Sequence, residues 1–190
     1  MQLKWTAVAL AALTLVACGK KEEAAAPTAA PATTTAAPAA APPASELVVK
    51  IGHVGPVSGP IAHLGKDNEL GARMAIEDLN AKQVKIGDKV AKFELVAEDD
   101  AGDPKQGTAV AQKLVDEKVN GVVGHLNSGT TIPASKLYSD AGIPQVSPSA
   151  TNPKYTRQGF KTTFRVVADD TQLGGTLGKY AVETLKGKNI

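Results

Sequence analysis

The chain has 190 residues, in which 21 lysines and arginines nearly balance 19 aspartates and glutamates, giving a formal net charge of +2. Charges of both signs are interspersed and aromatic residues make up 4% of the sequence, so we predict no nucleic-acid partner. The single cysteine, Cys18, leaves no second thiol for an internal disulfide.

The N-terminal residues have the pattern of an export signal. Lys4 precedes the apolar stretch Trp5–Val16, which is too short to cross a bilayer but typical of the hydrophobic part of a signal peptide. The stretch ends in LVAC, which resembles the lipobox of bacterial lipoproteins, in which the cysteine receives lipid. We therefore predict a lipoprotein signal peptide over residues 1–17 and a lipid anchor on Cys18. The alternative is an ordinary signal peptide followed by a chance cysteine.

Residues 18–45 consist mainly of Ala, Pro and Thr, with almost no branched apolar residue. Such a segment cannot bury enough apolar surface to offset the entropy lost on ordering, so we predict a tether. The folded part is expected to begin near Glu46, and the residues from there onward fit the length of one ordinary domain.

Strand-like and helix-like segments alternate along the folded part. Apolar runs rich in β-branched residues predict strands over residues 47–54, 92–97, 121–126, 143–147 and 162–167. Helical spacing of apolar residues predicts helices over 65–79, from an Asp103 cap to about 118, over 131–141 before Gly142, and from an Asp170 cap to Gly187. This alternation predicts an α/β fold, a parallel sheet flanked by helices. Because another strand is expected after the last helix, we interpret the sequence as an N-terminal fragment.

Two polar segments follow predicted strands and carry the main functional signal. They are VVGHLNSGTT (122–131) and IPQVSPSATNP (143–153), and each is an apolar run that ends in hydroxyl residues. In an open α/β sheet, ligands bind outside the carboxyl ends of the strands. We therefore expect one pocket wall rich in neutral donors, which suits a small zwitterionic or polar ligand better than bond-breaking chemistry.

A combination of motifs resembles one known family. DDAGDPKQ (99–106), GHLNSGTT (124–131) and SPSATNP (147–153), followed by RQGFKTTFRV (157–166), are similar to segments of the periplasmic leucine/isoleucine/valine-binding proteins. These are the substrate-binding components of branched-chain amino-acid ABC transporters. The likeness covers about residues 48–185, and the combination is far more specific than any single motif.

The resemblance implies a two-lobed periplasmic-binding fold that closes on its ligand like a hinge. Residues 46–168 correspond to most of lobe 1 and residues 169–190 to the start of lobe 2. The implied function is capture of free leucine, isoleucine, valine or a related amino acid, without a cofactor, for delivery to an ABC permease in the inner membrane. We expect a monomer that is exported to the periplasm, is lipid-anchored and is not an enzyme.

Ser128 matches the family's serine that hydrogen-bonds the ligand carboxylate. Independently of the resemblance, Asn127 and Ser128 lie where a helix begins, and free N–H groups there attract an anion. We therefore assign both residues to the ligand-binding set. The alternative is that Ser128 only caps the helix.

Ser149 and Thr151 match positions that supply a main-chain carbonyl and a hydroxyl to the ligand's ammonium group, and Thr151 also helps to hold the carboxylate. Ala150 is expected to line the pocket. The alternative is an ordinary turn rich in Ser, Thr and Pro. The acidic partner of the ammonium group is expected in lobe 2, outside this sequence.

Leu64 occupies a position where well-known members place an aromatic side chain over the ligand, which leaves the identity of the ligand open. The alternative is a leucine in a surface loop. Gly102 and Asn127 occupy two positions that are disulfide-linked cysteines in well-known members, consistent with a subfamily without that bridge.

Two functions other than transport are compatible with parts of the sequence. A ligand-sensing domain of the same fold, for amides or amino acids, stays open. An exported hydrolase would use Asp99 and Asp100, but these residues are expected to bond the backbone of their loop. The spacing of the three histidines lacks a compact zinc pattern (His53, His63 and His125). We predict no catalytic residue and no metal site.

Overall fold

The computed structural model describes residues 46–189. The predicted signal peptide, the predicted tether and Cys18, the predicted site of lipid attachment, lie outside the described residues. The first strand, β1 (Leu47–Gly55), begins one residue after Glu46, where the sequence places the start of the folded part.

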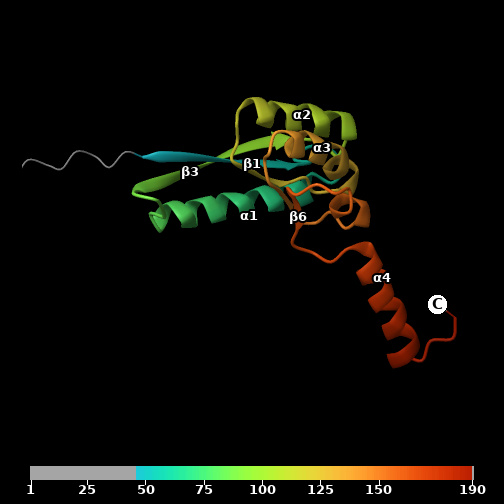
Figure 1. Cartoon of the computed structure of the whole chain (residues 1–190). Helices are drawn as coiled ribbons and strands as arrows, with labels where there is room; N and C mark the ends of the chain where they lie inside the picture. Colours follow the sequence, from blue (N-terminus) through green and yellow to red (C-terminus); the bar gives the residue numbers. More distant parts are fainter. Residues whose placement is uncertain (1–45, 190) are drawn as a thin grey trace, which may run out of the picture. The chain divides into compact units, whose positions relative to one another are not determined.

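The core element is a six-stranded sheet in the order β2-β3-β1-β4-β5-β6. Figure 1 labels β1, β3 and β6 of this sheet. The strands after β1 are β2 (Lys85–Ile86), β3 (Lys89–Asp99), β4 (Gly121–Gly124), β5 (Gln145–Ser147) and β6 (Thr163–Arg165). All neighbouring strands are parallel except the β2–β3 pair. The predicted α/β fold with a parallel sheet is confirmed. With β2 set aside, the strand order reverses direction between β1 and β4, as in other doubly wound sheets.

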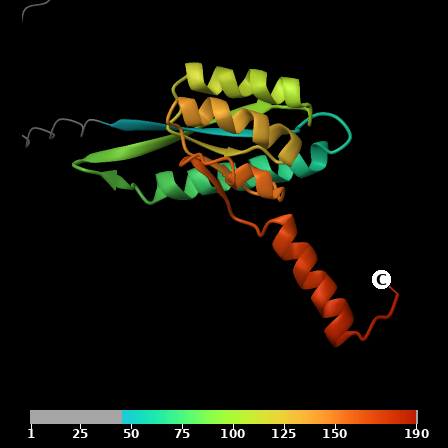
Figure 2. The same cartoon turned by 45° about the vertical axis from the view of Figure 1, so that its right-hand side comes forward.

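The helices cover both faces of this sheet. The four α-helices are α1 (Ala62–Ala81), α2 (Pro104–Asp116), α3 (Ser128–Asp140) and α4 (Asp170–Lys179). Helices α2 and α3 pack side by side on one face and α1 covers the other, as both views show (Figures 1 and 2). This placement follows from right-handed crossovers, because the chain moves in opposite directions across the sheet through α1 and α2.

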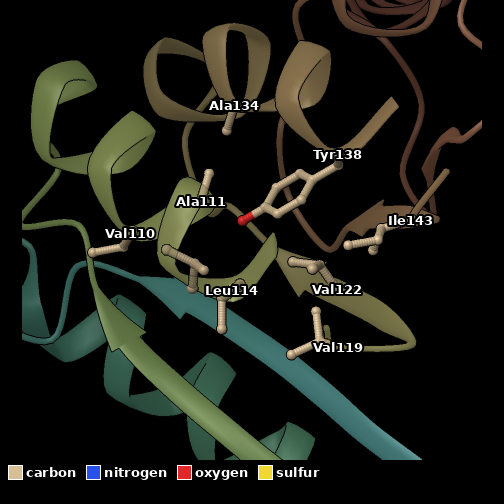
Figure 3. Packing of buried hydrophobic residues seen from close by; sticks show 9 residues of the cluster. Val110, Ala111, Leu114, Val119, Val122, Ala134, Tyr138 and Ile143 are labelled. Atoms are coloured by element: carbon tan, nitrogen blue, oxygen red, sulfur yellow. The ribbon is translucent and has the colours of Figure 1, made fainter. Parts of the chain in front are cut away.

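The apolar core lies between the sheet and the α2–α3 layer. Leu114 and Ala111 of α2 meet Tyr138 of α3 above Val122 of β4 (Figure 3), and each of these side chains is at most 2% exposed. Val110, Ala111 and Leu114 recur at helical spacing and form the buried face of α2. Burial of a leucine side chain contributes about 1.5–3 kcal/mol, so this layer fixes α3 and the residues that begin it.

Local signals in the sequence explain several helix ends. Asp103 caps α2 by accepting hydrogen bonds from the N–H groups of Lys105 and Gln106, each at 2.9 Å, and Pro104 is the first helical residue. Gly142 follows α3 with φ = +71°, a conformation that favours glycine. Both of these predictions are confirmed.

Several predicted boundaries were wrong, and one hairpin was missed. Helix α3 begins at Ser128, three residues before the predicted start, because the first turn is polar and gives no apolar period. The last helix is capped by Asp169 rather than Asp170, with the Asp169 carboxylate 3.0 Å from the N–H of Gln172. The hairpin between β2 and β3 was not predicted, although Gly87, with φ = +65°, and Asp88 are typical turn residues.

The last elements carry exposed apolar side chains. Helix α4 has no buried residue, and it continues into the short helix η2 (Tyr180–Thr184). Leu173, Leu177 and Tyr180 recur at helical spacing and are 42–68% exposed. Among the helices of residues 46–189, none has both the length and the apolar character needed to cross a membrane.

Candidate functional site

The predicted site residues gather at one edge of the sheet. Ser128 begins α3 after β4, and Thr151 follows β5 in a loop that leads to the short helix η1 (Pro153–Thr156). Leu64 lies in the first turn of α1, after β1. Because β1, β4 and β5 are parallel neighbours, the segments that follow them meet at the same edge, next to the point where the strand order reverses.

Hydrogen bonds join the loop after β4 to the loop after β5. The N–H of Asn152 donates to Oγ of Ser128 at 3.1 Å, and Oγ of Ser149 donates to the carbonyl of Leu126 at 2.7 Å. The residues of each pair are 24 and 23 positions apart in the sequence. The two loops therefore form one polar wall, as the two segments predicted.

Ser128 does not cap α3 with its side chain. The N-cap position is Asn127, whose side chain makes no capping hydrogen bond, and Ser128 is the first helical residue. Oγ of Ser128 accepts the N–H of Asn152, which leaves the hydroxyl hydrogen free to donate to another group. The N–H groups of Ser128 and Gly129 have no hydrogen-bond partner among residues 46–189. These three donors at a helix N-terminus match what a carboxylate accepts.

The loop after β5 offers a second set of polar groups. The N–H and the hydroxyl of Thr151, and the carbonyl of Ser149, have no hydrogen-bond partner within the described part of the chain. Thr151 and Ser149 are both partly exposed. Two donors beside a free carbonyl can serve both charged ends of a zwitterion, because a carboxylate needs donors and an ammonium group needs acceptors.

The other predicted residues play different parts in this geometry. Ala150 is 1% exposed, so it contributes a fixed backbone rather than an accessible side chain. Leu64 is 43% exposed at the same edge. Oδ1 of Asn127 is buried without a hydrogen-bond partner among the described residues, and Nδ2 lies 3.7 Å from the point where a Cβ on Gly102 would stand. Positions 102 and 127 are therefore adjacent, as the implied cysteine pair requires.

A buried polar network supports the loop after β4. Nδ1 of His125 lies 3.0 Å from Oδ2 of Asp100, and Nε2 lies 3.1 Å from the hydroxyl of Tyr138. His125 and Asp100 are fully buried. The carbonyl of His125 accepts the hydroxyls of Thr131 and Ser147 at 3.0 and 2.8 Å. The sequence does not predict this network, because its members are far apart in the chain.

Electrostatics favour a neutral imidazole and an ionised carboxylate in this network. Burial lowers the pKa of His125, and the hydrogen bond to Asp100 offsets only part of that effect. Burial raises the pKa of Asp100, but hydrogen bonds from His125 and from the N–H of Gly102 outweigh it, so the pKa lies below its ordinary value. Neutral His125 then donates from Nδ1 to Asp100 and accepts the Tyr138 hydroxyl at Nε2.

The two aspartates hold the backbone, as predicted. Oδ1 of Asp99 accepts the N–H groups of Val57 and Ala101 at 2.9 and 2.8 Å. Asp100 is fully buried, whereas Asp99 is partly exposed. Among residues 46–189, no cluster of His, Cys, Asp and Glu is suited to hold a metal ion.

A separate groove of about 450 Å³ lies on the α1 face of the sheet. Its lining includes Ala72 and Ala75 of α1, Val123 of β4 and Pro148. It does not include the unpartnered groups of Ser128 and Thr151, so we place the candidate site at the loops rather than in this groove.

Comparisons with known proteins agree with the sequence resemblance. The family model described as "Periplasmic binding protein" matches residues 48–190. The leucine-specific-binding protein of Salmonella typhimurium is 45% identical over 142 residues, which is 75% of this chain and 38% of that protein. The leucine-, isoleucine-, valine-, threonine- and alanine-binding protein of Pseudomonas aeruginosa is 44% identical over 142 residues, which is 75% of this chain and 37% of that protein.

A solved structure shares the fold. The branched-chain amino acid transporter substrate binding protein LivJ of Streptococcus pneumoniae, in complex with isoleucine, is 32% identical, with a TM-score of 0.66. The likeness covers 74% of this chain and 39% of that one. This chain thus spans less than half the length of the relatives that it matches. With the family model matched over most of its length, the chain belongs to the periplasmic binding protein family.

Proposed function

We propose that the chain carries the first lobe of a protein that captures a free branched-chain or related amino acid and delivers it to an ABC permease in the membrane. The observation that carries this proposal is the set of unpartnered groups on two joined loops: the N–H groups of Ser128, Gly129 and Thr151, the Thr151 hydroxyl and the Ser149 carbonyl. Donors for a carboxylate stand beside an acceptor for an ammonium group. The binding specificities in the names of the relatives point to the same class of ligand.

The two-lobe organisation is part of the proposal. Residues 46–168 form lobe 1, and residues 169–190 begin lobe 2. The exposed apolar side chains of α4, including Leu173 and Leu177, support this division, because a helix with an apolar stripe normally packs against other elements. The remaining ligand contacts, including the acidic partner of the ammonium group, then come from lobe 2.

Affinity arithmetic supports a second lobe. Micromolar capture of a ligand requires about 8 kcal/mol, whereas a dissociation constant near 1 mM requires about 4 kcal/mol. A handful of hydrogen bonds on one open wall, each contributing about 0.5–3 kcal/mol, fits the weaker figure. We therefore expect this chain by itself to bind leucine weakly.

The proposal places the protein in the periplasm, with Cys18 as its lipid anchor and a monomeric binding unit. It needs no cofactor, because binding and release transform no bond. Mass spectrometry of the protein made in a bacterial host with a lipoprotein export pathway tests the anchor. The expected mature N-terminus is a diacylated or triacylated Cys18, and an unmodified Cys18 contradicts this part of the proposal.

Titration of the ¹⁵N-labelled chain with L-leucine, followed by amide NMR signals, tests binding directly. The amide signals of Ser128, Gly129 and Thr151 are expected to move in a saturable way. Leucinamide keeps the side chain and the ammonium group but lacks the carboxylate, and it is expected to leave the Ser128 and Gly129 signals unmoved. Equal responses to the two compounds, or no response to L-leucine at saturating concentration, contradict the proposal.

A further inference from the structure

Arg165, the last residue of β6, makes a group of contacts that the binding account does not use. Its Nη1 donates to the carbonyl of Ala150 at 2.8 Å. Its Nη2 donates to the carbonyl of Asn152 at 3.0 Å and to Oγ1 of Thr156 at 2.8 Å. One guanidinium group therefore holds the backbone on both sides of Thr151.

The guanidinium group is itself fixed in place. It lies 5.4 Å from the ring centroid of Tyr155, within the range of a cation–π contact. Tyr155 is fully buried, and its hydroxyl donates to the carbonyl of Gln145 on β5 at 3.1 Å. Arg165 is thus attached to the sheet at its own strand and, through Tyr155, to the neighbouring strand.

The Thr151 carbonyl, which lies between the two carbonyls that Arg165 holds, also accepts a hydrogen bond. The carbonyl of Thr151 accepts the N–H of Asp170, the first residue of α4, at 2.9 Å. Three consecutive carbonyls, those of Ala150, Thr151 and Asn152, therefore have donors, and the peptide planes of this segment have little freedom to rotate.

These contacts decide where the free donors of the loop point. In a planar trans peptide, the carbonyl of one residue and the N–H of the next point in opposite directions. Because Arg165 holds the Ala150 carbonyl, the N–H of Thr151 is directed away from Arg165 and stays free of partners among residues 46–189. By the same rule, the Thr151 carbonyl points to Asp170 while the N–H of Asn152 reaches Ser128.

We propose that Arg165 is the positioning residue of the amino-acid site, which clamps the Ala150 and Asn152 carbonyls so that the N–H and hydroxyl of Thr151 are presented to the ligand. This inference rests on the proposed function for its ligand, but the clamp itself is a property of the ligand-free chain. A planar guanidinium group suits the task, because its Nη1 and Nη2 atoms reach two carbonyls at once. An ammonium group cannot do this with the same geometry.

The test compares Arg165→Met, Arg165→Lys and the matched control Arg73→Met, which removes an arginine that pairs with Glu69 on α1. Amide spectra of each ligand-free chain are recorded first. Arg165→Met is expected to move or broaden the Thr151 and Asn152 signals and to leave the core signal of Leu114 in place. Arg165→Lys is expected to give a smaller change, and Arg73→Met no change at Thr151.

The second stage measures the affinity for L-leucine. Arg165→Met is expected to raise the dissociation constant about tenfold or more, while Arg73→Met keeps the wild-type value. Undisturbed Thr151 and Asn152 signals in Arg165→Met overturn the clamp. Disturbed signals with an unchanged dissociation constant overturn the positioning role.

Two further results separate a failure of the proposed function from a failure of the Arg165 clamp. If the wild-type chain shows no response to L-leucine, the proposed function fails, whereas the ligand-free spectra still decide whether Arg165 holds the loop. If Arg165→Met does not fold, Arg165→Lys decides the question, because a lysine keeps the charge but cannot donate to the Ala150 and Asn152 carbonyls with the same two-pronged geometry. It is expected to disturb the Thr151 and Asn152 signals, and an undisturbed spectrum overturns the clamp.

Discussion

The N–H of Asn152 donates a hydrogen bond to Oγ of Ser128 across 3.1 Å, and this contact joins the two loops of the candidate site. It also orients the Ser128 hydroxyl, whose hydrogen stays available to a ligand. We predict that Ser128→Ala weakens leucine binding by about tenfold or more, because a hydrogen bond to a charged group contributes about 1.5–3 kcal/mol.

Amide NMR titration measures this effect, and Ser139→Ala, near the opposite end of α3, is the matched control. The control is expected to bind leucine with the wild-type dissociation constant. An unchanged dissociation constant in Ser128→Ala would remove Ser128 from the site.

Thr151→Val removes the free hydroxyl of the second loop and keeps the shape of the side chain. The N–H of Thr151 and the carbonyl contact to Asp170 are retained, so the loop is expected to keep its conformation. We predict a rise of about tenfold in the dissociation constant for leucine, without a loss of thermal stability. Parallel measurement of unfolding by circular dichroism separates the two effects, and a stable variant with wild-type affinity contradicts this assignment.

Gly65 lies where α1 passes close to the loop after β1. A Cβ at this position would overlap the backbone of Pro56, which cannot move as easily as a side chain. We predict that Gly65→Ala lowers the free energy of unfolding by about 1–3 kcal/mol. Gly71 on the same helix has no atom within 4 Å of its Cβ position, so Gly71→Ala is expected to raise stability by about 0.5–1 kcal/mol. Chemical denaturation tests the opposite signs, and equal effects of the two substitutions argue against the close approach.

Stability is predicted to depend on pH through His125. Burial lowers its pKa in the folded chain below the value of 6.5, so the unfolded chain takes up a proton more readily as the pH falls. The free energy of unfolding is therefore highest above that pH and decreases on acidification, with a slope of at most about 1.4 kcal/mol per pH unit for this group.

Denaturation of the wild type and of His125→Gln between neutral and mildly acidic pH measures this contribution. The substitution destabilises the chain at neutral pH, because it leaves the buried Asp100 without its partner, and the difference between the two proteins is expected to shrink as the pH falls. His53 is also buried, and its pKa is lowered mainly by burial and further by the nearby His125. His63→Gln controls for loss of an exposed imidazole. A difference that stays constant with pH contradicts a neutral His125.

The features that the sequence predicted correctly are mostly those set by a few adjacent residues. The Asp103-Pro104 pair begins α2, and Gly142 follows α3, because caps depend on a few adjacent residues. The placement of Ser128 and Thr151 at one edge followed from their positions after successive strands of a predicted parallel sheet. The bond from Asn152 to Ser128 joins residues 24 positions apart, and no local pattern specifies such a partner.

The supporting contacts of the site were the least predictable part. Asp100 and His125 are 25 positions apart, and no local sequence pattern indicates that they form a hydrogen bond. Arg165 ends the short strand β6, and the apolar residues beside it predicted only a strand. Its clamp on the Ala150 and Asn152 carbonyls depends on tertiary packing around Tyr155. The type of fold and the position of the site were therefore predictable, but the contacts that hold the loops were not.

A crystal structure of the chain grown with a saturating concentration of L-leucine tests the central claim most directly. The account predicts the leucine carboxylate within about 2.7–3.2 Å of the N–H groups of Ser128 and Thr151, with the ammonium group near the Ser149 carbonyl. Leucine bound in the groove beneath α1, or absent from both loops, would contradict it.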